Sequence, residues 1–224
     1  MEVLKTFRHE FKYLLSYEDM LRLRTKLNKL LNIDRDINGY MIRSLYFDSV
    51  NDDDYYDKLG GVINRKKVRL RIYEPNTDFV KLEIKAKHDI HQLKRSMILN
   101  KENALELIKG NYSILLDYDN ETAKEAYLIL REGLYKPKTI IEYQRIAYTG
   151  ETTTRITFDF DIKSSNDVEK FFDNEINYNN LSTKKDVVLE VKFDRFLEPY
   201  ISHILADYSS CQQSVSKYVM ARNV

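Results

Sequence analysis

The sequence predicts an α+β fold with a largely antiparallel sheet of about eight strands and flanking helices. Three observations lead to this prediction. Several segments alternate apolar and polar residues with the period of two that is typical of strands with one buried face. Segments with helical spacing and recognisable ends lie between them. No segment rich in Pro, Gly or Ser divides the 224 residues, so we predict one domain over residues 1–224.

Eight segments carry the strand pattern. The strict alternations lie at residues 68–73, 80–87, 155–161 and 187–194. The weaker ones cover about Val3–Leu14, Tyr40–Asp48, Gln92–Leu99 and Lys138–Thr149. A hairpin is expected around His88–Gln92, which favours antiparallel pairing.

Helices are predicted between the strands from their end signals. Ser16 with Asp19 resembles a capping box, and each glycine that ends a helix stands where a left-handed residue is wanted. Pro is a good first-turn residue. The predicted helices run from Ser16 to about Leu31, from Asn100 to Gly110, from Asn120 to Gly133, and onward from near Pro199.

Composition excludes several classes of protein. Lys plus Arg (36) nearly cancels Asp plus Glu (35), and the net charge of +1 gives no field that would attract nucleic acid nonspecifically. We therefore expect no specific nucleic-acid partner. The single cysteine, Cys211, excludes an intrachain disulfide and a four-cysteine zinc site. No apolar stretch approaches the about 18 to 20 residues of a membrane span, and no signal peptide is recognisable, so we expect a cytoplasmic protein without a transmembrane segment.

The polar positions of the predicted strands carry almost only ionised side chains. They include Arg8, Glu10, Lys12, Arg69, Arg71, Lys81, Glu83, Lys85, Arg155, Asp159, Glu190 and Lys192. Water-facing strand positions more often carry Thr, Ser or Gln, and neighbouring like charges repel. Two interpretations stay open. Either the polar face of an open sheet meets water, or the strands close into a barrel whose charged interior holds a long anion and a divalent cation.

A series of short motifs runs along the chain in a recognisable order. They are Glu-Phe-Lys-Tyr (10–13), Ser-Leu-Tyr-Phe-Asp (44–48), Val-Arg-Leu-Arg-Ile-Tyr (68–73), Leu-Glu-Ile-Lys (82–85), Tyr-Gln-Arg-Ile-Ala-Tyr (143–148), Arg-Ile-Thr-Phe-Asp (155–159), Leu-Glu-Val-Lys-Phe (189–193) and Ser-Lys-Tyr (216–218). Together they resemble the polyphosphate polymerase (VTC) domain of the triphosphate tunnel metalloenzymes, the CYTH-like superfamily. The resemblance spans the chain and implies an eight-stranded antiparallel β-barrel, the triphosphate tunnel fold, with flanking helices.

The resemblance also implies an activity and a set of site residues. It implies a metal-dependent polyphosphate polymerase that transfers the terminal phosphate of ATP onto a growing polyphosphate chain, with Mn²⁺ or Mg²⁺ as cofactor. The implied catalytic residues are Lys85, Arg145 and Glu190. The implied residues that bind ATP and polyphosphate are Lys12, Tyr46, Arg69, Arg71, Lys94, Arg155, Lys192 and Lys217. The metal ligand is Glu190, with Glu83 and Glu10 as lesser candidates. Phosphoryl transfer suits such residues because it needs mainly positioning and charge neutralisation.

One departure from the wider superfamily favours the polymerase. Relatives that hydrolyse triphosphate usually carry Glu-x-Glu-x-Lys near the amino terminus, whereas Arg8 here precedes Glu10 and Lys12. The exchange removes a carboxylate and adds a cation, which favours anion binding over two-metal hydrolysis. The chain looks like a stand-alone domain of bacterial type. Two alternatives stay open: an inorganic or nucleotide triphosphatase, and a non-catalytic polyphosphate-binding protein.

Other conspicuous residues have structural explanations. Asp52-Asp53-Asp54 lacks the Gly and Glu of a calcium loop and is interpreted as acids at a helix amino terminus. His88 and His91 are too few for a metal site, and Cys211 is interpreted as an apolar filler. No Walker-type or GxGxxG loop is present, so we expect side-chain cations to hold any nucleotide.

Overall fold

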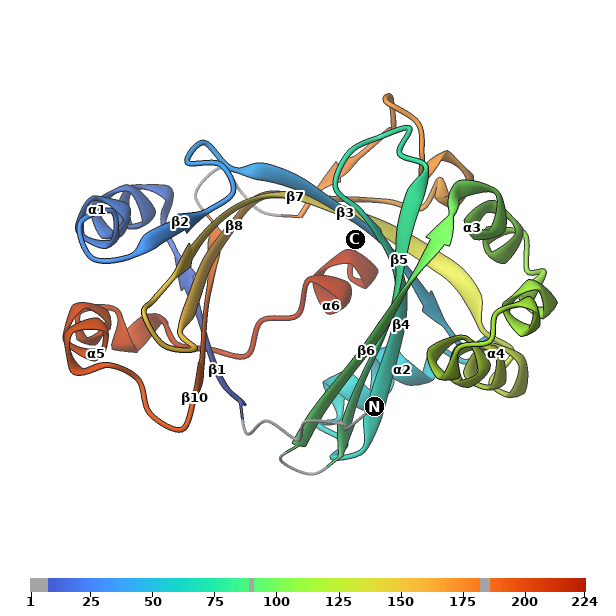
Figure 1. Ribbon diagram of the computed structural model, residues 1–224. Coiled ribbons are helices and arrows are strands. Elements are labelled where there is room, and N and C mark those ends of the chain that lie inside the picture. The colour runs from blue at the N-terminus through green and yellow to red at the C-terminus, as the bar shows by residue number, and fades with distance from the viewer. Residues whose placement is uncertain (1–7, 89–90, 182–185) are drawn as a thin grey trace. The chain divides into compact units, whose positions relative to one another are not determined.

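Ten strands form one hydrogen-bonded sheet in the computed structural model, which describes residues 8–88, 91–181 and 186–224 (Figure 1). The sheet order is β1-β10-β8-β7-β3-β4-β5-β6, with β2 paired to β7 and β9 paired to β8. The pairs β1–β10, β10–β8, β3–β4, β4–β5 and β5–β6 are antiparallel. The strands are β1 (Arg8–Leu15), β2 (Asn32–Asp34), β3 (Tyr40–Asp48), β4 (Arg65–Ile72), β5 (Phe79–His88), β6 (His91–Asn100), β7 (Lys136–Thr149), β8 (Arg155–Ser165), β9 (Asn179–Asn180) and β10 (Val187–Asp194).

The α+β class and the eight predicted strands are confirmed, but the closed eight-stranded barrel is not. The two additional strands, β2 and β9, have three and two residues, too few to show a period of two. The sheet path runs from β1 to β6, and no pairing joins these two strands among the residues described. Alternation indicates which residues share a face and carries no information about pairing between the ends of a sheet. The part of the first predicted strand before Arg8 lies outside the described residues.

The predicted helices are present, with caps as expected at their starts. Ser16 accepts a hydrogen bond from the Asp19 backbone N–H at 3.0 Å, and the Asn100 and Asn120 side chains cap the next two predicted helices. The helices are α1 (Tyr17–Leu27), α2 (Asp53–Leu59), α3 (Lys101–Ile108), α4 (Glu121–Glu132), α5 (Pro199–Ala206) and α6 (Lys217–Arg222), with short 3₁₀ helices at Tyr112–Asp117, Val168–Lys170 and Ser209–Cys211. Helix α1 ends at Leu27, four residues before the predicted end at about Leu31.

The two glycines that end predicted helices are required for different structural reasons. Gly110 has φ +92°, the left-handed conformation that the sequence predicts. Gly133 has φ −83°, so the prediction for it is wrong, and Leu134 takes the positive φ of 49° instead. A Cβ atom at position 133 would collide with the ring of Tyr135. Gly133 is therefore required for space and not for its backbone angle.

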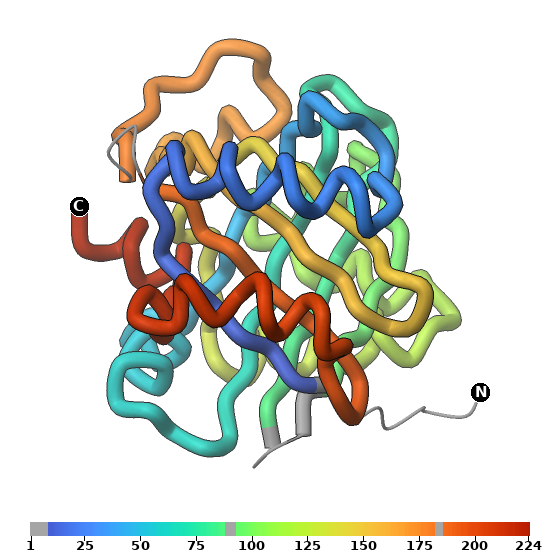
Figure 2. Tube along the Cα trace, turned by 90° about the vertical axis from the view of Figure 1, so that its left-hand side faces the viewer, coloured from blue at the N-terminus to red at the C-terminus, as the bar shows by residue number. Residues whose placement is uncertain are grey.

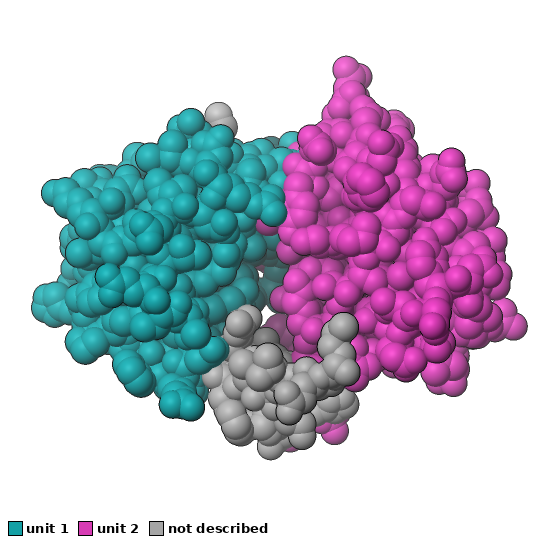
Figure 3. Space-filling view, in the orientation of Figure 1, with its two compact units in different colours: residues 1–41, 143–163, 180–217 teal, residues 42–142, 164–179, 218–224 magenta. Residues whose placement is uncertain are grey.

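The described chain consists of two compact units, each assembled from segments that are distant in the sequence (Figure 3). Unit 1 comprises residues 1–41, 143–163 and 180–217, and unit 2 comprises residues 42–142, 164–179 and 218–224. In unit 1, α1 and α5 lie on the same face of β1, β10 and β8 (Figure 2). Their apolar residues, such as Leu23 and Ile201, form a core with the apolar phase of these strands. In unit 2, α3 and α4 form a second core with the apolar phase of β4, β5 and β6.

None of the helices in the described part of the chain is long and apolar enough to cross a membrane.

The start of α2 confirms that the aspartates at 53 and 54 are helix amino-terminal acids. Asp54 is buried, and burial, opposed by a hydrogen bond from the Tyr135 hydroxyl at 2.7 Å, raises its pKa from 3.8 to about 7. The folded protein therefore binds more protons at Asp54 than the unfolded chain between about pH 4 and pH 7. The contribution of Asp54 to the free energy of unfolding is fully present below about pH 4 and is lost as the pH rises through about 7.

We therefore expect Asp54→Asn to flatten the pH dependence of the free energy of unfolding between pH 4 and pH 7. The contribution lost is at most about 1.4 kcal/mol per pH unit. Chemical denaturation at several pH values measures it. Tyr135→Phe removes a hydrogen bond that lowers the pKa of Asp54, so it should extend the sloping range to higher pH. Identical slopes for Asp54→Asn and the wild type would contradict the assignment.

Candidate anion-binding site

Several residues of the charged phase of the central strands are buried, in both units. Arg69 is 8% exposed, Arg71 7%, Glu83 0%, Asp159 0% and Glu190 7%. The apolar phase of the same strands is also buried, against the helices. A polar sheet face that meets water is therefore the wrong interpretation for these residues. Buried charges persist only when they are paired, and the pairs define the candidate site.

In unit 2, Glu83 on β5 lies among three predicted site cations from the adjacent strands β4 and β6. Glu83 accepts a hydrogen bond from Arg69 Nε at 2.7 Å, and Arg69 Nη2 lies 2.6 Å from the same oxygen. Lys94 Nζ lies 2.5 Å from the other oxygen of Glu83. Arg71 Nε lies 3.8 Å from the oxygen that Arg69 contacts. Arg69 also donates to the Tyr46 hydroxyl at 2.9 Å. Glu83 is thus the counter-ion of three cations.

The strand register places like charges directly opposite one another beside this group. Lys67 is opposite Lys85, and Lys85 is opposite Lys94, so three lysines form a row across β4, β5 and β6. Arg65 is opposite Lys87 in the next row. Like charges at opposite positions destabilise a sheet. We call the face of β4, β5 and β6 that carries Arg65, Lys67, Arg69, Arg71, Lys81, Glu83, Lys85, Lys87 and Lys94 the basic ladder.

The phenol of Tyr46 responds to the charge of the basic ladder. Burial alone would raise its pKa, because it disfavours the phenolate. Arg69, Arg71 and Lys67 outweigh burial and lower the pKa of Tyr46 below the usual 10.0. The ladder therefore has a positive potential at Tyr46, as a site for an anion would require.

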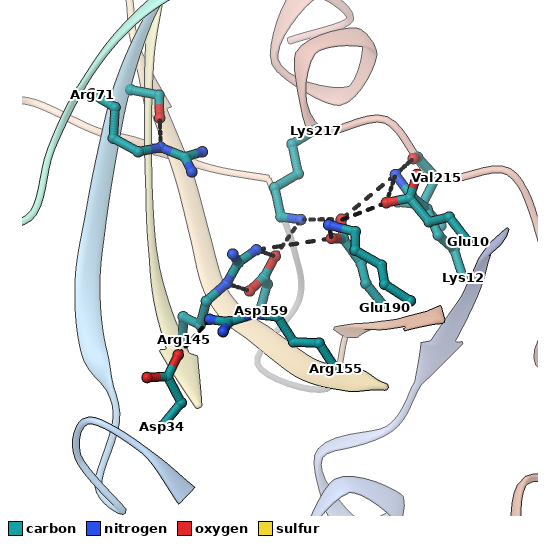
Figure 4. A network of polar contacts seen from close by, with 12 residues as sticks. Glu10, Lys12, Asp34, Arg71, Arg145, Arg155, Asp159, Glu190, Val215 and Lys217 are labelled. Carbon is teal, nitrogen blue, oxygen red and sulfur yellow. Dashed lines mark hydrogen bonds and ion pairs between the residues drawn. The ribbon is translucent and has the colours of Figure 1, made fainter. Parts of the chain in front are cut away.

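In unit 1, Glu190 on β10 lies among cations from β1, β10, β7 and α6 (Figure 4). Its Oε1 is 3.5 Å from both Lys12 Nζ and Lys217 Nζ, and its Oε2 is 3.1 Å from Lys192 Nζ. Arg145 Nη2 is 3.9 Å from Oε2. Burial would raise the pKa of Glu190, but Lys192, Lys12 and Lys217 hold it well below its usual range. Glu190 is therefore ionised.

A second carboxylate, Asp159 on β8, binds two of the same cations. Arg145 donates from Nε to Oδ1 at 2.6 Å and from Nη2 to Oδ2 at 2.7 Å. Lys217 Nζ lies 2.6 Å from Oδ2. Burial would lower the pKa of Lys217, but Asp159 and Glu190 raise it above its usual value. The unit 1 network, defined as Glu10, Lys12, Arg145, Asp159, Glu190, Lys192 and Lys217, thus keeps buried cations charged.

The whole described chain matches one protein family. A family model described as the VTC domain matches residues 7–224. The chain belongs to the VTC domain family. Comparison with curated protein sequences found no match.

Solved structures resemble the fold of this VTC domain at low sequence identity. A candidate adenylate cyclase from Bacillus halodurans is 16% identical over 94% of this chain and 93% of its own, with a TM-score of 0.57. A second candidate adenylate cyclase, from Vibrio parahaemolyticus, is 11% identical over 96% of this chain and 97% of its own, with a TM-score of 0.54. A Pyrococcus horikoshii protein is 13% identical over 97% and 99%, with a TM-score of 0.52. These likenesses concern the fold.

The VTC domain brings the predicted site residues together in two groups, one in each unit. Unit 1 holds Glu10, Lys12, Arg145, Arg155, Glu190, Lys192 and Lys217, and unit 2 holds Tyr46, Arg69, Arg71, Glu83, Lys85 and Lys94. Arg155 pairs with Asp34 at 2.6 Å, and in the described part of the chain it makes no ion pair with Glu190. The side chains of Arg8, His88 and His91 lie outside the described part of the chain.

Sequence reasoning gave no role to Asp159, although it named the residue among the charged strand positions. Asp159 ends the Arg-Ile-Thr-Phe-Asp motif and shares a strand phase with Arg155. That spacing was a signal for a common face. Its partner Lys217 is 58 positions further along the chain, a separation that no local pattern connects.

The VTC domain offers carboxylate oxygens to a divalent metal only in a limited way. Among the residues described, no group of three or more His, Cys, Asp or Glu side chains is placed to hold a metal ion. Both oxygens of Glu83 contact Arg69 or Lys94. Mg²⁺ commonly binds through one or two carboxylates together with phosphate oxygens of its substrate. Cations also lie at both oxygens of Glu190, but the nearest of them, Lys192, is 3.1 Å away, so these contacts are looser than those of Glu83. The donor set fits the magnesium mode with Glu190 as the carboxylate and Glu10, which shares Lys12 and Lys192 with it, nearby.

Proposed function

We propose that this VTC domain is a metal-dependent polyphosphate polymerase that transfers the terminal phosphate of ATP onto a polyphosphate chain. The observation that carries the proposal is the basic ladder. Its nine charged residues include eight cations and the single carboxylate Glu83. Rows of like charge destabilise a sheet in the absence of an anion, so a polyanion is the ligand that best offsets them.

The repeated geometry of the ladder favours an extended ligand over a single phosphate. Arg65, Lys67, Arg69 and Arg71 occupy alternate positions of β4, and lysines of β5 and β6 continue the row across the sheet, so these cations follow the strand spacing of about 4.8 Å. A polyphosphate chain carries negative charge along its whole length. The guanidinium forks of Arg69 and Arg71 match phosphate oxygens in a two-point contact. We assign Tyr46, Arg69, Arg71, Lys85 and Lys94 to phosphate binding on this basis.

The unit 1 network supplies what phosphoryl transfer requires of a protein. Lys12, Arg145, Lys192 and Lys217 would orient phosphate groups and neutralise the charge that spreads over their oxygens in the transition state. The attacking group belongs to the growing chain, so no protein nucleophile is needed. Mn²⁺ or Mg²⁺, when bound with the nucleotide through Glu190, would neutralise additional phosphate charge. Arg155 would add a further cation to this group.

The test is an assay of the purified protein with ATP and Mn²⁺ or Mg²⁺. We expect long-chain polyphosphate on a gel and ADP in stoichiometric amounts. Arg95→Ala is a suitable control, because Arg95 lies on the opposite phase of β6 and pairs with Glu125. This variant should retain full activity. Phosphate release without chain growth would favour a triphosphatase, and tripolyphosphate binding without turnover would favour a non-catalytic binder; either result overturns the polymerase.

A further inference from the structure

Both carboxylate oxygens of Asp159 bind cations within unit 1. The residue is 0% exposed, accepts two hydrogen bonds from Arg145 and pairs with Lys217 at 2.6 Å. A carboxylate that binds both Nε and Nη2 of an arginine fixes the plane of the guanidinium. Arg145 therefore has a defined orientation before any ligand binds.

The other contacts of these two cations do not define their positions. Glu190 lies 3.9 Å from Arg145 Nη2 and 3.5 Å from Lys217 Nζ, distances at which an ion pair has little directional preference. The Tyr143 ring centroid lies 5.4 Å from the Arg145 guanidinium carbon and 4.9 Å from Lys217 Nζ, a contact with a broad geometry. Among the described contacts, the short ones that orient Arg145 and Lys217 come from Asp159.

We infer that Asp159 is a positioning residue that holds Arg145 and Lys217 in the orientation in which they bind a phosphate chain. The inference rests on the proposed function, because it supposes a phosphate ligand in unit 1. Asp159 is fully buried, so it acts through these two cations. Glu10 differs from Asp159 in its contacts. It pairs with Lys12 at 3.8 Å and with Lys192 at 3.4 Å, and it makes no two-point contact with an arginine among the described contacts.

Two roles of Asp159 predict opposite effects of removing its charge. The unit 1 network holds the cations Lys12, Arg145, Lys192 and Lys217 against the carboxylates Glu10, Asp159 and Glu190. If Asp159 only reduced the positive field, Asp159→Asn would tighten anion binding. If it positions Arg145 and Lys217, the same substitution weakens binding even though the net charge becomes more positive. The sign of the change therefore separates the two roles.

The experiment is titration calorimetry with tripolyphosphate in the presence of a chelator, so that no metal contributes. We expect Asp159→Asn to raise the Kd about 10-fold or more, as the loss of charge-assisted positioning implies. Glu10→Gln, which removes a carboxylate that makes no two-point contact with an arginine in the described part of the chain, should lower the Kd. Thermal unfolding of each variant verifies that the fold is retained. Asp159→Asn binding as tightly as the wild type, or more tightly, overturns the inference.

Two further variants distinguish positioning from a general structural role. Arg145→Lys keeps the charge but cannot make the two-point contact with Asp159, so it should weaken binding by a similar factor. In an Arg145→Ala background, Asp159→Asn should add little, because contacting residues are coupled. Full additivity in this cycle, or unchanged affinity for Arg145→Lys, overturns the inference even if Asp159→Asn proves unstable. A wild-type protein that binds no tripolyphosphate overturns the proposed function as well, whereas wild-type binding that is insensitive to these variants overturns only the positioning role.

Discussion

Replacing Arg69 and Arg71 by Ala, together with Glu83→Gln, is expected to reduce the affinity for tripolyphosphate by about 100-fold or more. Each arginine offers charge-assisted hydrogen bonds worth about 1.5–3 kcal/mol. Glu83 is changed at the same time because it is 0% exposed and would otherwise lose two of its cations. Removing one partner of a buried ion pair leaves the other charge unpaired and costs about 3–5 kcal/mol of stability. Calorimetry at two salt concentrations measures both the affinity and its salt dependence.

The control for the triple variant replaces Arg95, a cation of the same unit that pairs with Glu125 and not with Glu83. Arg95→Ala removes the partner of Glu125 and should leave the affinity for tripolyphosphate unchanged. Glu83→Gln alone should tighten binding, since the basic ladder loses its carboxylate. Wild-type affinity for a folded triple variant would show that the ladder is not the anion site.

Replacing Glu190 by Gln is expected to lower turnover of ATP by about 100-fold or more, a typical effect of losing one preorganised electrostatic group. Binding of tripolyphosphate without metal should be retained or become tighter. The reason is that Glu190 opposes an anion by its charge, while Lys12, Lys192 and Lys217 around it would be released to the phosphate. The measurements are steady-state kinetics with Mn²⁺ and calorimetry with a chelator.

Glu198→Gln is a matched control for Glu190→Gln. Glu198 is a buried glutamate of the same unit, but its oxygens accept hydrogen bonds from Thr152 and Thr154. This variant should keep turnover within about threefold, because Glu198 makes no ion pair with a cation of the unit 1 network in the described part of the chain. Unchanged turnover in Glu190→Gln would remove this residue from the catalytic assignment. A folded Glu190→Gln protein that no longer binds tripolyphosphate would contradict its proposed role as a metal carboxylate.

Much of the local structure could be predicted because its causes are local. Ser16, Asn100 and Asn120 cap helices through their own side chains, and Tyr40–Asp48 is the strand that its residues predict. Gly133 shows where this reasoning stops. Its backbone angle is ordinary, and its lack of a side chain is required by the neighbouring Tyr135 ring, a contact made after the helix has ended.

The candidate site could be predicted as a list of residues and not as an arrangement. The resemblance to the VTC domain, which the family match confirms, named Arg69, Arg71 and Glu190. It did not indicate which cations Glu83 would neutralise, or that Asp159 would hold Arg145. Those contacts depend on strand register, which places side chains from distant segments opposite one another.

The sequence by itself determined which residues share a strand face, because a period of two places alternate side chains on opposite sides of the sheet. It also determined the VTC family, through motifs distributed along the chain. Only the tertiary structure decided that part of each charged face is buried, since alternation is the same whether the polar side contacts water or other side chains. It also decided which cations meet which carboxylates. Burial makes that choice matter, because an unpaired charge away from water is far more costly than the same charge on a surface.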